Sequence, residues 1–83
     1  MPYIKQHQRV DFRDALDSVN PEDAGELNYV LTQVCLDYFQ GSEGRYQQIN
    51  DILGALEGCK LEFYRRLAAP YEDKKITENG DVY

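Results

Sequence analysis

Tryptophan is absent from this chain, histidine occurs once, as His7, and cysteine occurs twice, as Cys35 and Cys59. The two cysteines are far apart, with no CxxC motif and no histidine nearby, so neither a disulfide framework nor a zinc site is expected. No apolar run approaches the roughly 20 residues that span a membrane, and no signal peptide is recognisable. We therefore expect a soluble protein in the reducing cytoplasm.

The sequence also has few of the features that enzymes need. His7 lies in a polar stretch without a neighbouring nucleophile, and no two carboxylates stand in apolar surroundings that would separate their pKa values. The segment "GSEG" lacks the lysine and the preceding strand of a phosphate-binding loop, and no HExxH or EF-hand spacing occurs. The prediction is a non-enzymatic protein with no catalytic residues, no metal and no cofactor.

Acidic residues outnumber basic ones, which gives a formal net charge of -6 and a pI near 4.6 over 83 residues. Such a charge argues against binding to long nucleic acid, although a small anion at a local basic cluster is not excluded. A chain of this length makes one domain, residues 1–83, and buries only about 60 to 65% of its unfolded surface. Homo-oligomerisation is therefore expected to supply further stability.

Helical patterns occupy most of the chain. Asp11 is expected to cap a short helix, Asn20 and Pro21 to begin a second one, and Gly41 to end it. The predicted helices lie near residues 11–19, 24–40, 45–69 and 71–79, after an extended lead-in over residues 1–10. The expected fold class is all-α: a small helical bundle with a hooked C-terminal arm, residues 70–83, assembled as a homo-oligomer.

Pro70 is expected to end the long helix and bend the chain, because the residue before a proline avoids helical geometry. Two structures then compete for the arm. Asn79 and Gly80 fit either the turn of a hairpin or the left-handed C-cap of a helix. We favour the helix, since an isolated hairpin with three-residue arms is marginal in water.

The second predicted helix is apolar on nearly all sides. One stripe consists of Leu27, Val30, Leu31, Val34 and Tyr38. Tyr29, Leu36 and Phe39 lie on the reverse side. Companion helices from so short a chain do not easily cover both sides, so these three residues are predicted to contact a second copy.

The third predicted helix carries the stripe that is expected to form the core, namely Ile49, Ile52, Leu53, Leu56, Cys59, Phe63 and Leu67. Gly54, Gly58 and Leu61 lie on the opposite side. Each interior glycine costs a helix about 1 kcal/mol relative to alanine, so this pair suggests close approach of another backbone. The alternative is that they are tolerated surface glycines.

Basic and aromatic residues gather near the end of the chain, where Tyr64, Arg65, Arg66, Tyr71, Lys74 and Lys75 are the candidate ligand-binding residues. Arginine forks match phosphate oxygens, and tyrosine rings stack on bases, so the cluster suits a nucleotide-sized anion. The competing and more common structural role is pairing with neighbouring acids and with the helix dipole. Tyr83 is expected to fasten the arm to a sister subunit.

A resemblance to a known family rests on three segments: "MPYIKQ", "GELNYVLT" and above all "LEFYRRLAAPYEDKKITENGDVY". The chain resembles a family of small, uncharacterised proteins of bacteriophages and bacteria, for which no activity or catalytic residue is established. The resemblance implies a phage protein in the host cytoplasm that counters host defence. It would sequester a cyclic nucleotide or ADP-ribose-derived signal at subunit interfaces. The alternatives are an inhibitor that contacts a defence protein directly, as an acidic mimic or occluder, and a purely structural helical oligomer.

Overall fold

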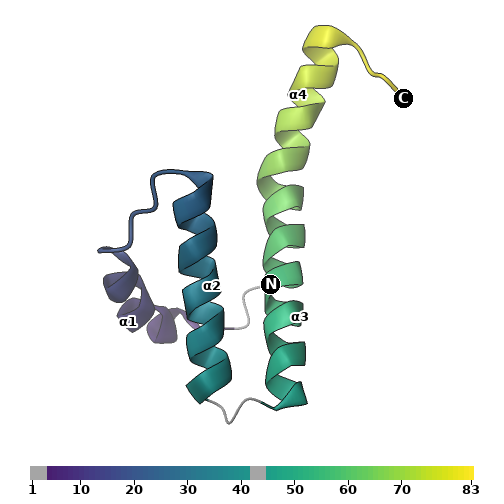
Figure 1. Ribbon diagram of the computed structural model, residues 1–83. Helices are drawn as coiled ribbons and strands as arrows, with labels where there is room; N and C mark the ends of the chain where they lie inside the picture. Colours follow the sequence, from purple (N-terminus) through teal and green to yellow (C-terminus); the bar gives the residue numbers. More distant parts are fainter. Residues whose placement is uncertain (1–3, 42–44) are drawn as a thin grey trace. The chain divides into compact units, whose positions relative to one another are not determined.

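The computed structural model describes residues 4–41 and 45–83, and all regular structure in these ranges is helical (Figure 1). The elements are α1 (Gln6–Leu16), α2 (Ala24–Gly41), α3 (Tyr46–Phe63), the π-helical segment η1 (Tyr64–Ala68) and α4 (Ala69–Asn79). The all-helical class is confirmed. The chain divides into two units, Met1–Ile49 and Asn50–Tyr83.

Helix α1 begins well before the predicted cap at Asp11, so the extended lead-in is wrong over residues 6–10. The physical reason is a glutamine cap. The Gln8 side chain accepts a hydrogen bond of 3.0 Å from the Lys5 backbone N–H, and the Arg9 guanidinium donates two bonds to the Ile4 carbonyl. These bonds fix the entry of the helix, and residues 1–3 of the lead-in lie outside the described residues.

The same device recurs at α3, where the Gln48 side chain accepts a hydrogen bond of 3.0 Å from the Arg45 backbone N–H. In both helices a glutamine stands three residues after a basic residue at the entry. Asparagine, aspartate and serine are the usual caps, so a lysine or arginine at the entry is a weak sequence signal of a helix start.

Helix α2 matches its prediction near 24–40, but its cap is Asp23 rather than Asn20. The Asp23 carboxylate accepts a hydrogen bond of 2.8 Å from the Glu26 backbone N–H, and Glu26 reaches back to the Glu22 N–H at 3.1 Å. The arrangement resembles a capping box, except that the second bond comes from Glu22, the residue before the cap, instead of from Asp23 itself. Asn20 instead donates to the Asp17 carbonyl in the preceding turn.

Pro70 does not end the long helix, and the predicted bend at this residue is wrong. The helix continues from α3 through η1 into α4, as Figure 1 shows. A proline ring in a regular α-helix collides with the carbonyl four residues earlier, here that of Arg66. The wider π turn relieves this collision, since the Ala69 N–H bonds to the Tyr64 carbonyl, five residues back.

The helix favoured for the arm is confirmed, and the chain leaves the helix axis at Gly80 instead of at Pro70 (Figure 1). Gly80 has φ 85°, which lies in the left-handed region, and its N–H donates to the Ile76 carbonyl at 2.8 Å. Beyond it the Asp81 carboxylate accepts a bond of 2.9 Å from the Tyr83 N–H.

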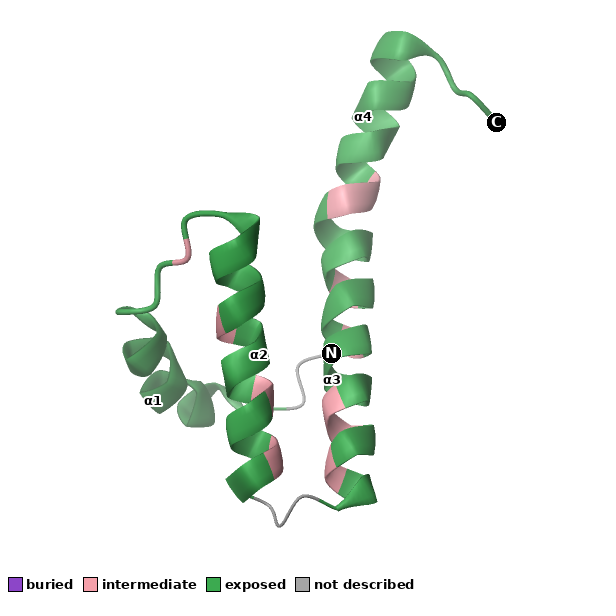
Figure 2. Ribbon diagram, in the orientation of Figure 1, coloured by how far each residue is buried: buried purple, intermediate pink, exposed green. Residues whose placement is uncertain are grey.

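None of the described residues is buried, as the green and pink colouring in Figure 2 shows. The stripe expected to form the core is open: Leu53, Phe63 and Leu67 are 63%, 61% and 57% exposed. The prediction of a core along this stripe is therefore wrong for the single chain. Both sides of α2 are also open, with Val34 and Tyr29 more than half exposed.

Candidate functional site

The predicted basic and aromatic cluster lies along the continuous helix formed by α3, η1 and α4. Arg65 and Arg66 both stand in η1, and both are paired with Glu62 one turn earlier. Arg65 Nη2 and Arg66 Nε each lie 3.0 Å from the same carboxylate oxygen, Glu62 Oε2. The arginine side chains are about two-thirds exposed, so these pairs contribute only about 0 to 1 kcal/mol each.

Tyr64 is held by a carboxylate rather than left open for a ligand. Its hydroxyl donates a hydrogen bond of 3.1 Å to Glu72 Oε2, eight residues further along. The bond to this carboxylate raises the pKa of Tyr64, because loss of the proton would break the bond and place two negative charges together.

The second half of the cluster lies on α4. Lys75 Nζ is 3.1 Å from Glu78 Oε2 and 5.5 Å from the centre of the Tyr71 ring, a cation–π contact. Lys74 has no ion pair within residues 4–41 and 45–83. Tyr71 is 61% exposed, so its ring remains available for stacking.

The charges of this segment cancel. Residues 62–78 contain four basic side chains, Arg65, Arg66, Lys74 and Lys75, and four acidic ones, Glu62, Glu72, Asp73 and Glu78. A neutral segment does not generate the positive field that attracts a phosphate from a distance. The geometry therefore agrees with the structural role of these residues more closely than with a preformed anion site.

A hollow of about 320 Å³ lies beside the end of α4. It is lined by Glu72, Lys75, Ile76, Asn79, Gly80, Asp81, Val82 and Tyr83. Neither Arg65 nor Arg66 lines it, and two carboxylates accompany its one ammonium group. An anion would meet repulsion here.

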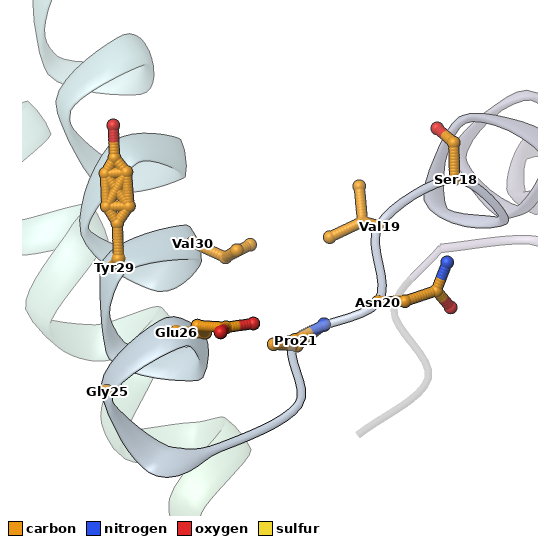
Figure 3. A pocket seen from close by; sticks show the side chains of 8 residues that line it. All are labelled: Ser18, Val19, Asn20, Pro21, Gly25, Glu26, Tyr29 and Val30. Carbon is orange, nitrogen blue, oxygen red and sulfur yellow. The ribbon is translucent and has the colours of Figure 1, made fainter.

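A second hollow, of about 500 Å³, was not anticipated from the sequence and lies between the end of α1 and the start of α2 (Figure 3). Its lining residues are Ser18, Val19, Asn20, Pro21, Gly25, Glu26, Tyr29 and Val30. Figure 3 shows Val19 and Val30 pointing toward one another across it. Two of its polar side chains are engaged locally: Ser18 donates to the Ala15 carbonyl, and Glu26 accepts from the Glu22 N–H. The loop "SVNPED" contains no sequence motif that would predict a binding site.

The residues predicted to meet a second copy are accessible, apart from the half-buried Phe39 and Gly58. Tyr29 and Leu61 are each 58% exposed, Leu36 is 42% exposed, and Tyr83 is fully exposed. A methyl group built on Gly54 would meet open space in this chain. These side chains are therefore accessible to a second copy.

A family model described as a domain of unknown function, DUF6899, matches residues 1–82. The chain belongs to this family. The match confirms the resemblance to an uncharacterised family and supplies no activity to transfer. Searches of the curated proteins and of the solved structures found no match.

No helix in residues 4–41 and 45–83 is both long and apolar enough to cross a membrane. Within the same ranges, no group of three or more histidine, cysteine, aspartate or glutamate side chains is arranged to hold a metal ion.

Proposed function

We propose that this protein is a non-enzymatic, homo-oligomeric binding protein whose working surface is completed by a second copy. The observation that carries the proposal is the exposure of its apolar side chains. A chain of 9.6 kDa has an accessible surface of 7577 Å². A compact monomer of that mass is expected to expose about 5,100 Å².

The excess, about 2,500 Å² per chain, amounts to about 5,000 Å² for a dimer, which is the upper end of the range for obligate interfaces. The residues responsible are large and apolar, among them Phe12, Leu53, Phe63 and Leu67, each more than half exposed. Burial of such side chains stabilises a fold by about 1.5 to 3 kcal/mol each. A second copy is the simplest source of that burial for so short a chain.

Multi-angle light scattering after size exclusion tests the proposal. The expected mass is that of a dimer or higher oligomer, and the midpoint of thermal unfolding should rise with protein concentration. A monomeric mass at micromolar concentration, with a concentration-independent midpoint, would overturn it.

A second candidate function is sequestration of a small nucleotide-derived signal at the subunit boundary, as expected of a counter-defence protein. The observation in its favour is that one carboxylate, Glu62, serves two guanidinium groups, and that Lys75 and the Tyr71 ring lie together. A phosphate could displace the exposed pairs, since charge-assisted bonds to phosphate are stronger than surface ion pairs.

Thermal stabilisation by cyclic nucleotides and ADP-ribose derivatives tests the second candidate. Arg65→Ala with Arg66→Ala should remove the stabilisation and leave the oligomer intact, whereas Arg9→Ala, on α1, serves as the control and should change neither. Stabilisation that survives the double substitution would assign binding elsewhere. An absence of stabilisation by all of these compounds would favour the direct contact of a protein partner.

A further inference from the structure

We propose that the copies pair through one stripe of the long helix, running antiparallel about an axis at Cys59. The stripe consists of Ile52, Leu56, Cys59, Phe63, Leu67 and Tyr71, all within the unit Asn50–Tyr83. The inference rests on the proposed function, because it names the surface and the arrangement of the oligomer proposed above.

The π turn keeps this stripe in line. From Phe63 to Tyr71 is eight residues, and in an α-helix eight residues rotate about 80° beyond two full turns. The π turn absorbs one residue, so that Phe63, Leu67 and Tyr71 remain on one side. The 3.1 Å bond from Tyr64 to Glu72 has the same eight-residue spacing and supports this register.

The stripe is open and apolar. Phe63, Leu67 and Tyr71 are 61%, 57% and 61% exposed, Leu56 is 39% exposed, and Cys59 is a free thiol in an exposed position. Within its own unit the segment is a single helix followed by a short tail, which offers nothing to cover one side of that helix. Helices of this kind are stabilised by packing against another helix.

The spacing along the stripe is nearly the same in both directions from Cys59. In an antiparallel pair Ile52 would face Leu67 of the second copy, and Leu56 would face Phe63. The contact of Leu56 with Phe63 joins a smaller side chain to a larger one, and Ile52 and Leu67 are of equal size, so neither contact sets two of the largest side chains of the stripe against each other. A parallel pair would instead place Phe63 against Phe63.

The distribution of charge along the helix also favours the antiparallel arrangement. It indicates that the partner packed on this stripe is a second copy of the chain. Residues 50–59 carry Asp51 and Glu57 and no basic residue, a net charge of -2. Residues 60–69 carry Lys60, Arg65 and Arg66 against Glu62, a net charge of +2. An antiparallel pair centred at Cys59 places each half against its complement, whereas a parallel pair places like against like.

The first test compares two substitutions with the same chemistry. Phe63 and Leu61 are 61% and 58% exposed and lie on opposite sides of the helix. Phe63→Glu should raise the dissociation constant of the oligomer by at least roughly 30-fold, the effect of a central interface residue. Leu61→Glu is the matched control and should leave the mass unchanged. If Leu61→Glu dissociates the oligomer and Phe63→Glu does not, the stripe is the wrong surface.

The second test determines whether the long helices of the two copies run antiparallel or parallel. Two variants are made in a background with Cys35→Ala and Cys59→Ala, one carrying Ile52→Cys and the other Leu67→Cys. Positions 52 and 67 are about 22 Å apart along the helix at 1.5 Å per residue. Each variant alone should stay uncrosslinked under mild oxidation, and only the mixture should form a disulfide-linked dimer.

The results of the two tests separate the proposals. Crosslinking of Ile52→Cys with itself would show a parallel pair and overturn the inference while leaving the proposed oligomer intact. Failure of the mixture to crosslink, with scattering still reporting an oligomer, would overturn the inference in the same way. A monomeric mass for the unsubstituted chain would overturn both.

Discussion

The hydroxyl of Tyr64 donates a hydrogen bond to the carboxylate of Glu72, two turns further along the same continuous helix. In a regular α-helix side chains eight residues apart diverge by about 80°. The π turn at Tyr64–Ala68 takes up the additional residue and returns the two side chains to one side. Pro70 directly follows this turn, and the turn relieves the collision of its ring with the Arg66 carbonyl. We therefore infer that a proline expected to end the helix instead sets the register of the residues after it.

Replacement of Glu72 should lower the pKa of Tyr64. In Glu72→Gln the carboxylate that raises this pKa is gone, and the value should return toward that of an ordinary tyrosine. Titration of the tyrosine ring carbons by NMR measures the change. Glu78→Gln, on the same helix, should leave Tyr64 unaffected, and an equal shift in both variants would contradict the assignment.

The same bond predicts how stability depends on pH. Because the folded-state pKa of Tyr64 is raised, the contribution of the bond is fully present below the unfolded pKa, near 10, and is lost as pH rises through the folded value. Thermal unfolding midpoints of the unsubstituted protein should fall more steeply above pH 10 than those of Tyr64→Phe. Parallel curves would contradict the prediction.

Substitution of Pro70 should remove the π turn. Pro70→Ala restores a backbone N–H and removes the collision with the Arg66 carbonyl, so the segment should become a regular α-helix. Tyr64 and Glu72 should then separate, and the pKa of Tyr64 should fall although Glu72 is still present. Hydrogen exchange should show stronger protection of residues 66–70, and an unchanged pKa of Tyr64 would show that the turn has another cause.

Substitutions of Asp23 and Asn20, which both precede α2, test which residue caps this helix. Asp23→Ala should cost about 1 kcal/mol of unfolding free energy, because the Glu26 N–H loses its acceptor. Asn20→Ala should cost much less, since Asn20 makes only a long bond of 3.4 Å to the Asp17 carbonyl. Urea denaturation at fixed protein concentration compares the two variants, and equal losses would restore Asn20 as a cap.

Two glycines on the long helix should respond in opposite directions. Gly80→Ala should destabilise by about 1 to 3 kcal/mol, because φ 85° with ψ 147° is a conformation that other residues rarely adopt. Gly54→Ala should stabilise by up to about 1 kcal/mol, because the added methyl group meets open space. A loss of oligomer mass in Gly54→Ala would instead place a second backbone against this glycine.

Local patterns in the sequence determined most of the helices. The apolar periodicity placed α2 and the body of α3. The helix was favoured for the arm because a hairpin with three-residue arms is marginal, and Gly80 fitted its C-cap because only glycine adopts this backbone conformation easily. The sequence also lacks a long apolar run, and no helix within residues 4–41 and 45–83 is long and apolar enough to cross a membrane. The family match confirmed the resemblance that the N-terminal and C-terminal segments carried.

Contacts made in three dimensions decided the rest. The glutamine side chains that begin α1 and α3, the shared carboxylate of Glu62 and the π turn at Pro70 all depend on where side-chain atoms lie, which residue types alone do not specify. The largest difference between the sequence prediction and the structure concerns the stripe through Phe63 and Leu67. Periodicity shows which side of a helix is apolar, but whether that side is covered depends on what packs against it, and in a single chain of 83 residues it stays open.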